Sequence, residues 1–176
     1  MITDWAEIGR QIGSIREDGE AGGDDYATAA FETILGDEWI TATVEYSISM
    51  KRGQEVAMNC LRLLRSEKAV LYAYQIYKSS TGERASQAVW FIKQMANPIS
   101  ISWIEEFLND PNVIEWGLGV LDKLLWGEEM PYDEKAKSLL DLAVTNSNGI
   151  LQEHVNFIKE YIAERDNSSF GREHSN

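Results

Sequence analysis

The segment ASQAVWFI (85–92) has counterparts at intervals of 29 residues: ATAAFETI (27–34), VAMNCLRL (56–63) and IEWGLGVL (114–121). The first, fifth and eighth positions are small or apolar in every copy, and positions four and three residues apart share one face of a helix. The chain therefore repeats one helix four times. A helix repeated at a fixed period, with a second helix between copies, indicates an α-solenoid whose units bury their apolar faces against their neighbours.

These three positions define apolar rows that we expect to form the core. The rows are Ala27, Val56, Ala85 and Ile114; Phe31, Cys60, Val89 and Leu118; and Ile34, Leu63, Ile92 and Leu121.

The segments between the copies supply the other helix, which is the first of each pair. We predict pairs at 37–50 with 54–66, 69–79 with 83–96, and 99–109 with 112–126. The first of these segments is rich in β-branched residues, which favour strands. Ile40, Val44 and Ile48 nevertheless recur at four-residue spacing, which favours a helix. Turn-forming or helix-breaking residues at 51–53, 79–82, 97–98 and 110–112 separate the predicted helices.

The ends of the chain depart from the 29-residue spacing. A helix is predicted over 3–15, capped by Thr3 or Asp4, and a glycine-rich acidic loop over 18–25. Asp24 or Asp25 can cap the helix at 26–35, which Gly36 closes. After the acidic loop 127–135 we expect helices over about 133–144 and about 151–162, then a disordered tail. The predicted organisation is one helical-repeat domain over 1–166 and a tail over 167–176.

Composition is that of a globular protein of 176 residues, with 44% hydrophobic and 10% aromatic residues. The single cysteine, Cys60, cannot form an internal disulfide and is predicted to be a small buried residue in a reducing compartment. No segment approaches the roughly 20 apolar residues that span a bilayer, and no signal peptide is apparent. We therefore expect a cytoplasmic protein.

The charge is acidic and unevenly distributed. Sixteen Lys and Arg stand against 29 Asp and Glu, a net charge of −13. Segments 1–38 and 105–141 are acidic, whereas 51–93 is basic. This balance argues against binding nucleic acid or an anionic membrane, because phosphate contact needs clustered cations. It favours a basic protein partner, although acids that only keep the domain soluble explain it equally well.

Motifs for catalysis are missing from the sequence. It has no phosphate-binding glycine loop, nucleophile elbow, paired cysteine or His-Glu-x-x-His. Of the two histidines, His154 is predicted on or near a helix surface and His174 lies in the tail. Adjacent carboxylates such as Glu105 and Glu106 point to different sides of a helix and are expected to be solvated rather than to bind a metal. We predict no enzymatic activity, cofactor or metal; an enzymatic solenoid remains a third alternative.

Tryptophans outside the apolar rows mark a candidate partner surface. Trp90 and Trp116 occupy repeat positions that hold Glu, Gly or Gln in other copies, so their indoles are candidates for partial exposure. Exposed tryptophans are enriched at binding hot spots. The alternative is that each indole packs between repeat units with its N–H near water. The predicted partner-binding residues are Glu83, Gln87, Trp90, Glu115, Trp116, Asp122, Trp126, Glu128, Glu129 and Tyr132.

The helix pair joined by Asn109-Asp110-Pro111-Asn112 and followed by VIEWGLGVLDKLL (113–125) resembles HEAT-like repeats. The resemblance covers about residues 25–126, but the 29-residue units are shorter than the family's usual length of about 40. The Arg or Lys common near the end of the second helix is matched only loosely, by Arg65 and Lys123. The predicted fold is all-α, with antiparallel helix pairs stacked as a short HEAT-like α-solenoid.

Compact acidic HEAT-like proteins of this size resemble immunity proteins of bacterial toxin systems such as contact-dependent growth inhibition. The resemblance implies a protein, monomeric when free, that binds a cognate basic toxin domain, a nuclease for example, and occludes its active site. An adaptor or scaffold that binds a helix or peptide of a larger complex is the alternative.

Overall fold

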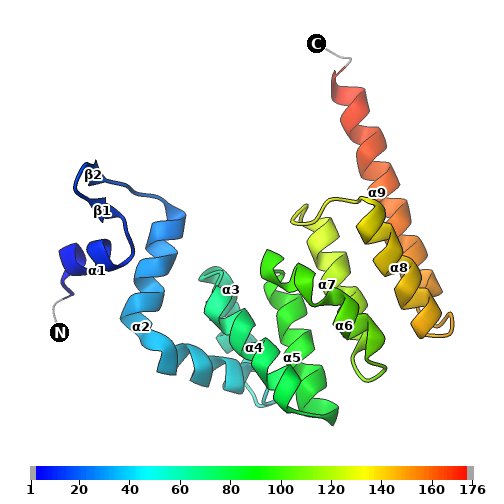
Figure 1. The fold of residues 1–176 in the computed structure, drawn as a ribbon, viewed down its shortest axis with the longest axis horizontal. Helices are drawn as coiled ribbons and strands as arrows, with labels where there is room; N and C mark the ends of the chain where they lie inside the picture. The colour runs from blue at the N-terminus through cyan, green and yellow to red at the C-terminus, as the bar shows by residue number, and fades with distance from the viewer. Residues whose placement is uncertain (1–2, 174–176) are drawn as a thin grey trace. The chain divides into compact units, whose positions relative to one another are not determined.

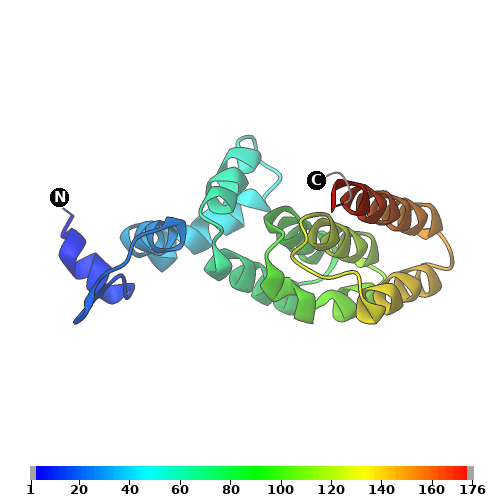
Figure 2. The same ribbon diagram turned by 90° about the horizontal axis from the view of Figure 1, so that it is seen from above.

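The computed structural model describes the backbone of residues 3–173 and the side chains of residues 3–165, and in this part of the chain the fold is all-α (Figures 1 and 2). The chain forms two compact units, Met1–Ala73 and Tyr74–Asn176. The prediction of an all-α protein is confirmed, whereas the single domain over 1–166 and the solenoid arrangement stay predictions.

The first unit contains four helices, one of which continues into the second unit. They are α1 (Trp5–Gln11), α2 (Asp24–Ser47), α3 (Gln54–Leu63) and α4 (Glu67–Ser79), with a short antiparallel pair of strands, β1 (Ile15–Arg16) and β2 (Gly19–Glu20). The predicted helix 3–15 therefore ends at Gln11. Asp4 caps α1 as predicted, because its side chain accepts a hydrogen bond from the Glu7 amide.

Helix α2 joins two of the predicted helices across a kink at Gly36 (Figure 1). This glycine has φ 77° and ψ 162°, a conformation that residues with a Cβ rarely adopt. The segment after the kink is helical as predicted, in spite of its β-branched residues. Asp24 and Asp25 lie in the first turn of α2 rather than at the cap, which is Gly23; there their charge complements the helix dipole.

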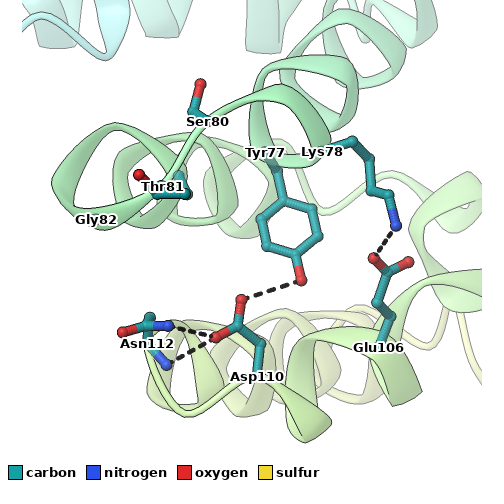
Figure 3. Close-up of a pocket in the computed structure, with 9 residues that line it drawn as sticks. Tyr77, Lys78, Ser80, Thr81, Gly82, Glu106, Asp110 and Asn112 are labelled. Atoms are coloured by element: carbon teal, nitrogen blue, oxygen red, sulfur yellow. Dashed lines mark hydrogen bonds and ion pairs between the residues drawn. The ribbon is translucent and has the colours of Figure 1, made fainter.

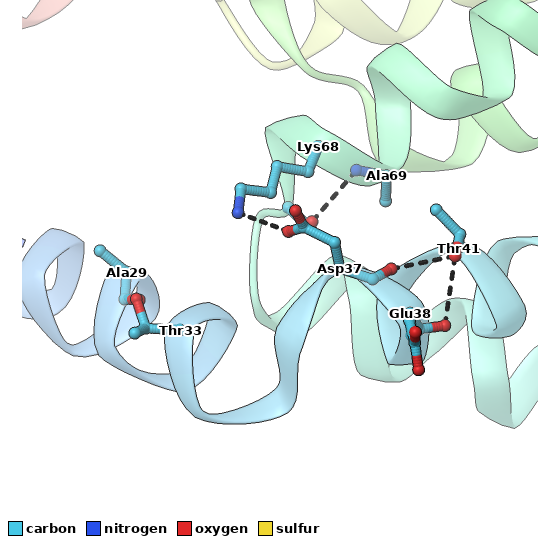
Figure 4. A network of polar contacts seen from close by, with 8 residues as sticks. Ala29, Thr33, Asp37, Glu38, Thr41, Lys68 and Ala69 are labelled. Carbon is cyan, nitrogen blue, oxygen red and sulfur yellow. Dashed lines mark hydrogen bonds and ion pairs between the residues drawn. The ribbon is translucent and has the colours of Figure 1, made fainter. Parts of the chain in front are cut away.

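Hydroxyl groups along α2 donate hydrogen bonds to backbone carbonyls of the same helix. Its threonines are therefore accommodated in the helix, although their β-branched side chains favour strands. Thr33 donates to the Ala29 carbonyl and Thr41 to the Asp37 carbonyl, at 2.8 and 2.9 Å (Figure 4). Asp37 also accepts from the Lys68 ammonium at 2.7 Å, which ties α2 to the start of α4 within the first unit.

The second unit contains the end of α4 and the remaining helices. These are α5 (Gly82–Met95), the 3-10 helix η1 (Pro98–Ser102), α6 (Ile104–Asn109), α7 (Ile114–Trp126), α8 (Glu134–Asn146) and α9 (Gln152–Glu173). Helix α7 packs against α5, α6 and α8, and α8 packs against α9 (Figure 2). The predicted helix 99–109 is divided into η1 and α6. Asn97 caps η1 and Asp133 caps α8.

The core of the second unit follows the repeat. Val89, Ile92, Leu118 and Leu121 are fully buried, as the apolar rows predict. Gly117 allows α7 to approach α6, because a Cβ at this position would lie 2.7 Å from the Phe107 Cβ. These buried rows lie where α5 and α7 pack together.

In the first unit the same rows are exposed, so the prediction that they form the core is wrong for the first two copies. Phe31 and Ile34 on α2 and Val56, Cys60 and Leu63 on α3 all face solvent. Helix α3 buries Met58 and Leu61 instead. The predicted burial of Cys60 is wrong for the same reason: the repeat specifies an apolar face, but no element among the described residues of the first unit covers it.

The end of the chain also differs from the prediction. The sequence predicts a disordered tail from Asn167, whereas the backbone of α9 continues to Glu173. Extending an existing helix avoids the cost of nucleation, so a polar segment can continue a helix that an apolar segment began. Residues 174–176, which include His174, lie outside the described residues.

Candidate functional site

Trp116 and Asp122, both predicted to belong to one partner-binding surface, lie on different sides of α7. Trp116 faces α5, where its indole N–H donates to the Ser86 hydroxyl at 2.9 Å. The Lys93 ammonium lies 5.1 Å from the centre of the same indole ring, a cation–π distance. The half-buried ring and the bonded N–H of Trp116 agree with the packing alternative, and its contact with a partner stays a prediction.

Asp122 faces α9 on another side of α7. Its carboxylate accepts a hydrogen bond from the Tyr161 hydroxyl at 3.1 Å, and its other oxygen lies 3.2 Å from the His154 Nε2. Tyr161 also donates to the Asp122 backbone carbonyl at 3.3 Å. Asp122 is half-buried, so these contacts assign it to the α7–α9 interface rather than to an open acidic surface.

The end of α7 carries an exposed aromatic side chain. Trp126 is 64% exposed, and the edge of its ring meets Tyr161 at a centroid distance of 5.0 Å and an angle of 72°. Phe157, also exposed, contacts Tyr161 from α9 at 5.6 Å. Tyr161 therefore supports two exposed rings, one from each helix.

Acidic residues follow Trp126 directly. Glu128 and Glu129 are exposed in the turn after α7, whose amides bond back to the Leu125 and Leu124 carbonyls. Arg165 donates to the Leu125 carbonyl at 3.0 Å and lies 3.5 Å from the Glu128 carboxylate. We call Trp126, Glu128, Glu129, Phe157 and Tyr161 the aromatic–acid patch.

Phe157 and Tyr161 were missed by sequence reasoning. Both lie outside the apolar row of the closing helix, Leu151, Val155, Ile158 and Ile162, which is buried. Their spacing of four residues places two rings on a second face of the same helix. This aromatic pair, four residues apart, is the feature of the sequence that indicates a second aromatic face on the closing helix.

The remaining predicted residues lie away from this patch or beside it. Glu83 is exposed and Gln87 and Trp90 are half-buried on α5, while Glu115 is exposed near the start of α7. Tyr132 is half-buried in the loop before α8, where the Lys137 ammonium lies 5.8 Å from its ring centre. Trp126, Glu128 and Glu129 are thus the predicted residues that the structure places in the aromatic–acid patch.

A small polar pocket of about 230 Å³ lies between the end of α4, the start of α5 and α6 (Figure 3). Its carboxylates are already paired. Asp110 accepts from the Tyr77 hydroxyl at 3.3 Å and from the backbone and side-chain nitrogens of Asn112 at 2.9 Å each. Glu106 pairs with Lys78. These bonds explain the pocket as helix packing, and we assign it no ligand.

Three tyrosines of the second unit donate to carboxylates, and burial is the largest cause of their shifted pKa values. Burial and the hydrogen bond to Glu106 raise the pKa of Tyr74 to about 12. Burial and the nearby carboxylates of Asp110 and Asp122 raise the pKa of Tyr77 and Tyr161, respectively, above the usual value.

Alkaline titration tests these contacts. Because the three folded pKa values lie above the unfolded value of about 10, the stabilisation is complete below pH 10 and is lost as the pH rises through and beyond that value. Denaturant titrations at increasing pH should show the free energy of unfolding falling above pH 10. Tyr161→Phe should make that fall less steep, and an unchanged slope would contradict the assigned Tyr161–Asp122 contact.

No group of three or more His, Cys, Asp or Glu side chains within the described residues is placed to hold a metal ion. Among the helices described, none combines the length and apolar character needed to cross a membrane. No family model, curated protein or solved structure matches the chain.

Proposed function

We propose that this chain is a protein-binding module for a basic protein, and specifically an immunity protein that occludes the active site of a cognate toxin domain. The observation that carries the proposal is Trp126, 64% exposed beside a second exposed ring and two exposed glutamates. The proposal includes the cytoplasm as the place of action, a nuclease as the expected toxin, and a HEAT-like stacking of the helix pairs.

The aromatic–acid patch has the chemistry of a binding hot spot. Trp is among the residues that contribute most to protein interfaces, and an exposed apolar group gains free energy when a partner covers it. Because Trp126 and Phe157 each make an edge contact with the Tyr161 ring, the two side chains are partly ordered before a partner binds, which reduces the entropy lost on binding. Rigid aromatic anchors at the surface therefore favour a protein partner over a small molecule.

The acids around the patch favour a basic partner. The segment 105–141 carries ten acids and three bases, and Glu128 and Glu129 lie directly beside Trp126. Carboxylates at the edge of an interface accelerate the encounter with a cationic surface and exclude anionic competitors. A nuclease domain, which must attract a phosphate backbone, presents such a cationic surface.

The direct experiment begins with the genes beside this one. A large secreted protein encoded immediately upstream, with a small basic carboxy-terminal domain, would supply the candidate toxin, whereas the absence of such a gene would favour the adaptor alternative. Purified domain and full-length chain would be combined in a calorimetric titration, and co-expression would test protection of cells. We expect a dissociation constant far below micromolar and loss of toxicity. An affinity weaker than micromolar would contradict the proposal.

Charge reversal tests the surface itself. Glu128→Lys with Glu129→Lys should slow association and weaken binding about tenfold or more, with a reduced dependence on salt. The loss of the ion pair between half-buried Arg165 and exposed Glu128 should lower the free energy of unfolding by less than about 1 kcal/mol. Circular dichroism would verify that the variant is folded.

The matched control is Glu17→Lys with Glu20→Lys, which makes the same charge change at exposed positions of the first unit. If binding depends on net charge alone, both double variants should weaken it equally, and the assignment to the aromatic–acid patch is wrong. Binding that ignores both changes would favour the adaptor alternative.

A further inference from the structure

The first unit contains an apolar groove between α2 and α3. Two adjoining hollows, of about 690 and 600 Å³, share Trp39 and Cys60 in their lining. The first extends along Phe31 and Leu63, and the second along Tyr46 and Val56. We call this continuous surface the α2–α3 groove.

The groove exposes large apolar side chains, which are normally buried when a helix packs in a folded protein. Leu63 is 83% exposed, and Phe31, Tyr46 and Val56 are also exposed. Helix α3 buries Met58 and Leu61 on its opposite side, so it is apolar on two faces. A helix with two apolar faces requires two neighbours, and within the part of the chain that the structure describes α2 is the one helix in extensive contact with α3.

The repeat indicates what kind of element is missing. Phe31, Cys60 and Leu63 occupy the repeat positions of Val89, Leu118 and Leu121, which are fully buried where α5 and α7 pack together. The exposed rows are therefore helix-packing faces. The groove fits an apolar helix, bound through residues spaced three and four apart.

The two walls of the groove carry opposite charges. Residues 24–38, on the α2 side, contain five acids and no base, including Asp24 and Asp25 at the rim. Residues 51–68, which include α3, contain five bases and two acids, with Arg62 and Arg65 at the rim. The α3 segment is thus complementary in both apolar pattern and charge to the α2 wall.

We propose that a second copy of this chain occupies the groove, with the α3 helix of each copy docked against the α2 wall of the other. A two-fold arrangement covers both exposed faces at once and leaves no open end for further association. Arg62 and Arg65 of each copy then approach Asp24 and Asp25 of the other. The proposal concerns the first unit and does not depend on the proposed toxin partner.

The oligomeric state of the full-length chain tests this proposal. Sedimentation velocity and light scattering over a range of concentrations should show a monomer–dimer equilibrium. Leu63→Glu should abolish the dimer, because a carboxylate would be buried in the apolar contact. Ile150→Glu, at a position that is likewise 83% exposed but lies in the second unit, should leave the dimer intact.

A mixing experiment separates contacts between copies from effects within one copy. Arg62→Glu/Arg65→Glu and Asp24→Arg/Asp25→Arg should each be monomeric alone, because the walls that meet then carry like charges. Mixed in equal amounts, the two variants should form a heterodimer, because each contact then joins an acidic wall of one variant to a basic wall of the other. An effect confined to one folded copy cannot produce this recovery.

Three results would overturn the proposal. They are a wild-type chain that stays monomeric at every concentration, a dimer that survives Leu63→Glu, and charge variants that fail to pair on mixing. A monomer whose binding to the toxin domain is lost on Leu63→Glu, with its fold intact, would assign the groove to that partner instead.

Discussion

Replacing Ile92 with alanine is expected to lower the free energy of unfolding by about 2–5 kcal/mol. Ile92 is fully buried on α5, in the third apolar row of the repeat. Removing most of its side chain loses hydrophobic transfer free energy and leaves a cavity that the surrounding helices fill only in part. Chemical denaturation followed by circular dichroism would measure the change.

Ile34→Ala provides the matched control, because Ile34 occupies the same repeat position two repeats earlier, in the first compact unit, but is 43% exposed. This substitution should change the free energy of unfolding by about 0.5 kcal/mol or less. Equal losses at the two positions would show that the first-unit row is buried in solution. The exposed groove could then no longer be assigned.

Replacing Trp126 with alanine is expected to weaken binding to the toxin domain about 30-fold or more, which corresponds to roughly 2 kcal/mol. The ring is exposed beside two glutamates and rests on Tyr161, so a partner that covers it buries the indole against a supported surface. The dissociation constant, from calorimetric titration, should rise mainly through faster dissociation.

Trp5→Ala controls for the loss of any exposed tryptophan, since Trp5 is also exposed but belongs to α1 in the first unit. It should leave the affinity unchanged. Denaturation of the Trp126 variant should show only the loss of one aromatic contact, about 0.5–1.5 kcal/mol. Equal effects of the two tryptophans on affinity would mean that the aromatic–acid patch is not the contact surface.

The positions of most helices could be predicted from the sequence. Periodicity and turn residues placed α3, α4, α5, α7 and α8 within a few residues of their observed bounds. The signals are local: a face repeated every three or four residues, turn residues between the helices, and a break at Gly36. They failed near the start, where the predicted helix over 3–15 ends at Gln11 and Ile15 enters a strand pair.

The structure does not bring all the predicted site residues onto one surface. Trp126, Glu128 and Glu129 are exposed as a binding surface requires, but Asp122 binds Tyr161 and His154, and Trp116 binds Ser86. A single helix pattern shows that a residue lies off the apolar row, but not which neighbouring helix it meets there. Phe157 and Tyr161 joined the site because α9 packs beside the end of α7, a relation that no local pattern encodes.

The sequence by itself determined that the chain is helical and that four helices carry the same apolar face, because helix formation and amphipathic patterning depend on residues within one or two turns. Tertiary structure alone decided which of these faces are covered. Val89, Ile92, Leu118 and Leu121 are buried because α5 and α7 meet, whereas Phe31, Cys60 and Leu63 remain exposed because no helix among the described residues of the first unit covers them. Burial depends on contacts between residues far apart in the chain, so identical patterns gave a core in one unit and an open groove in the other.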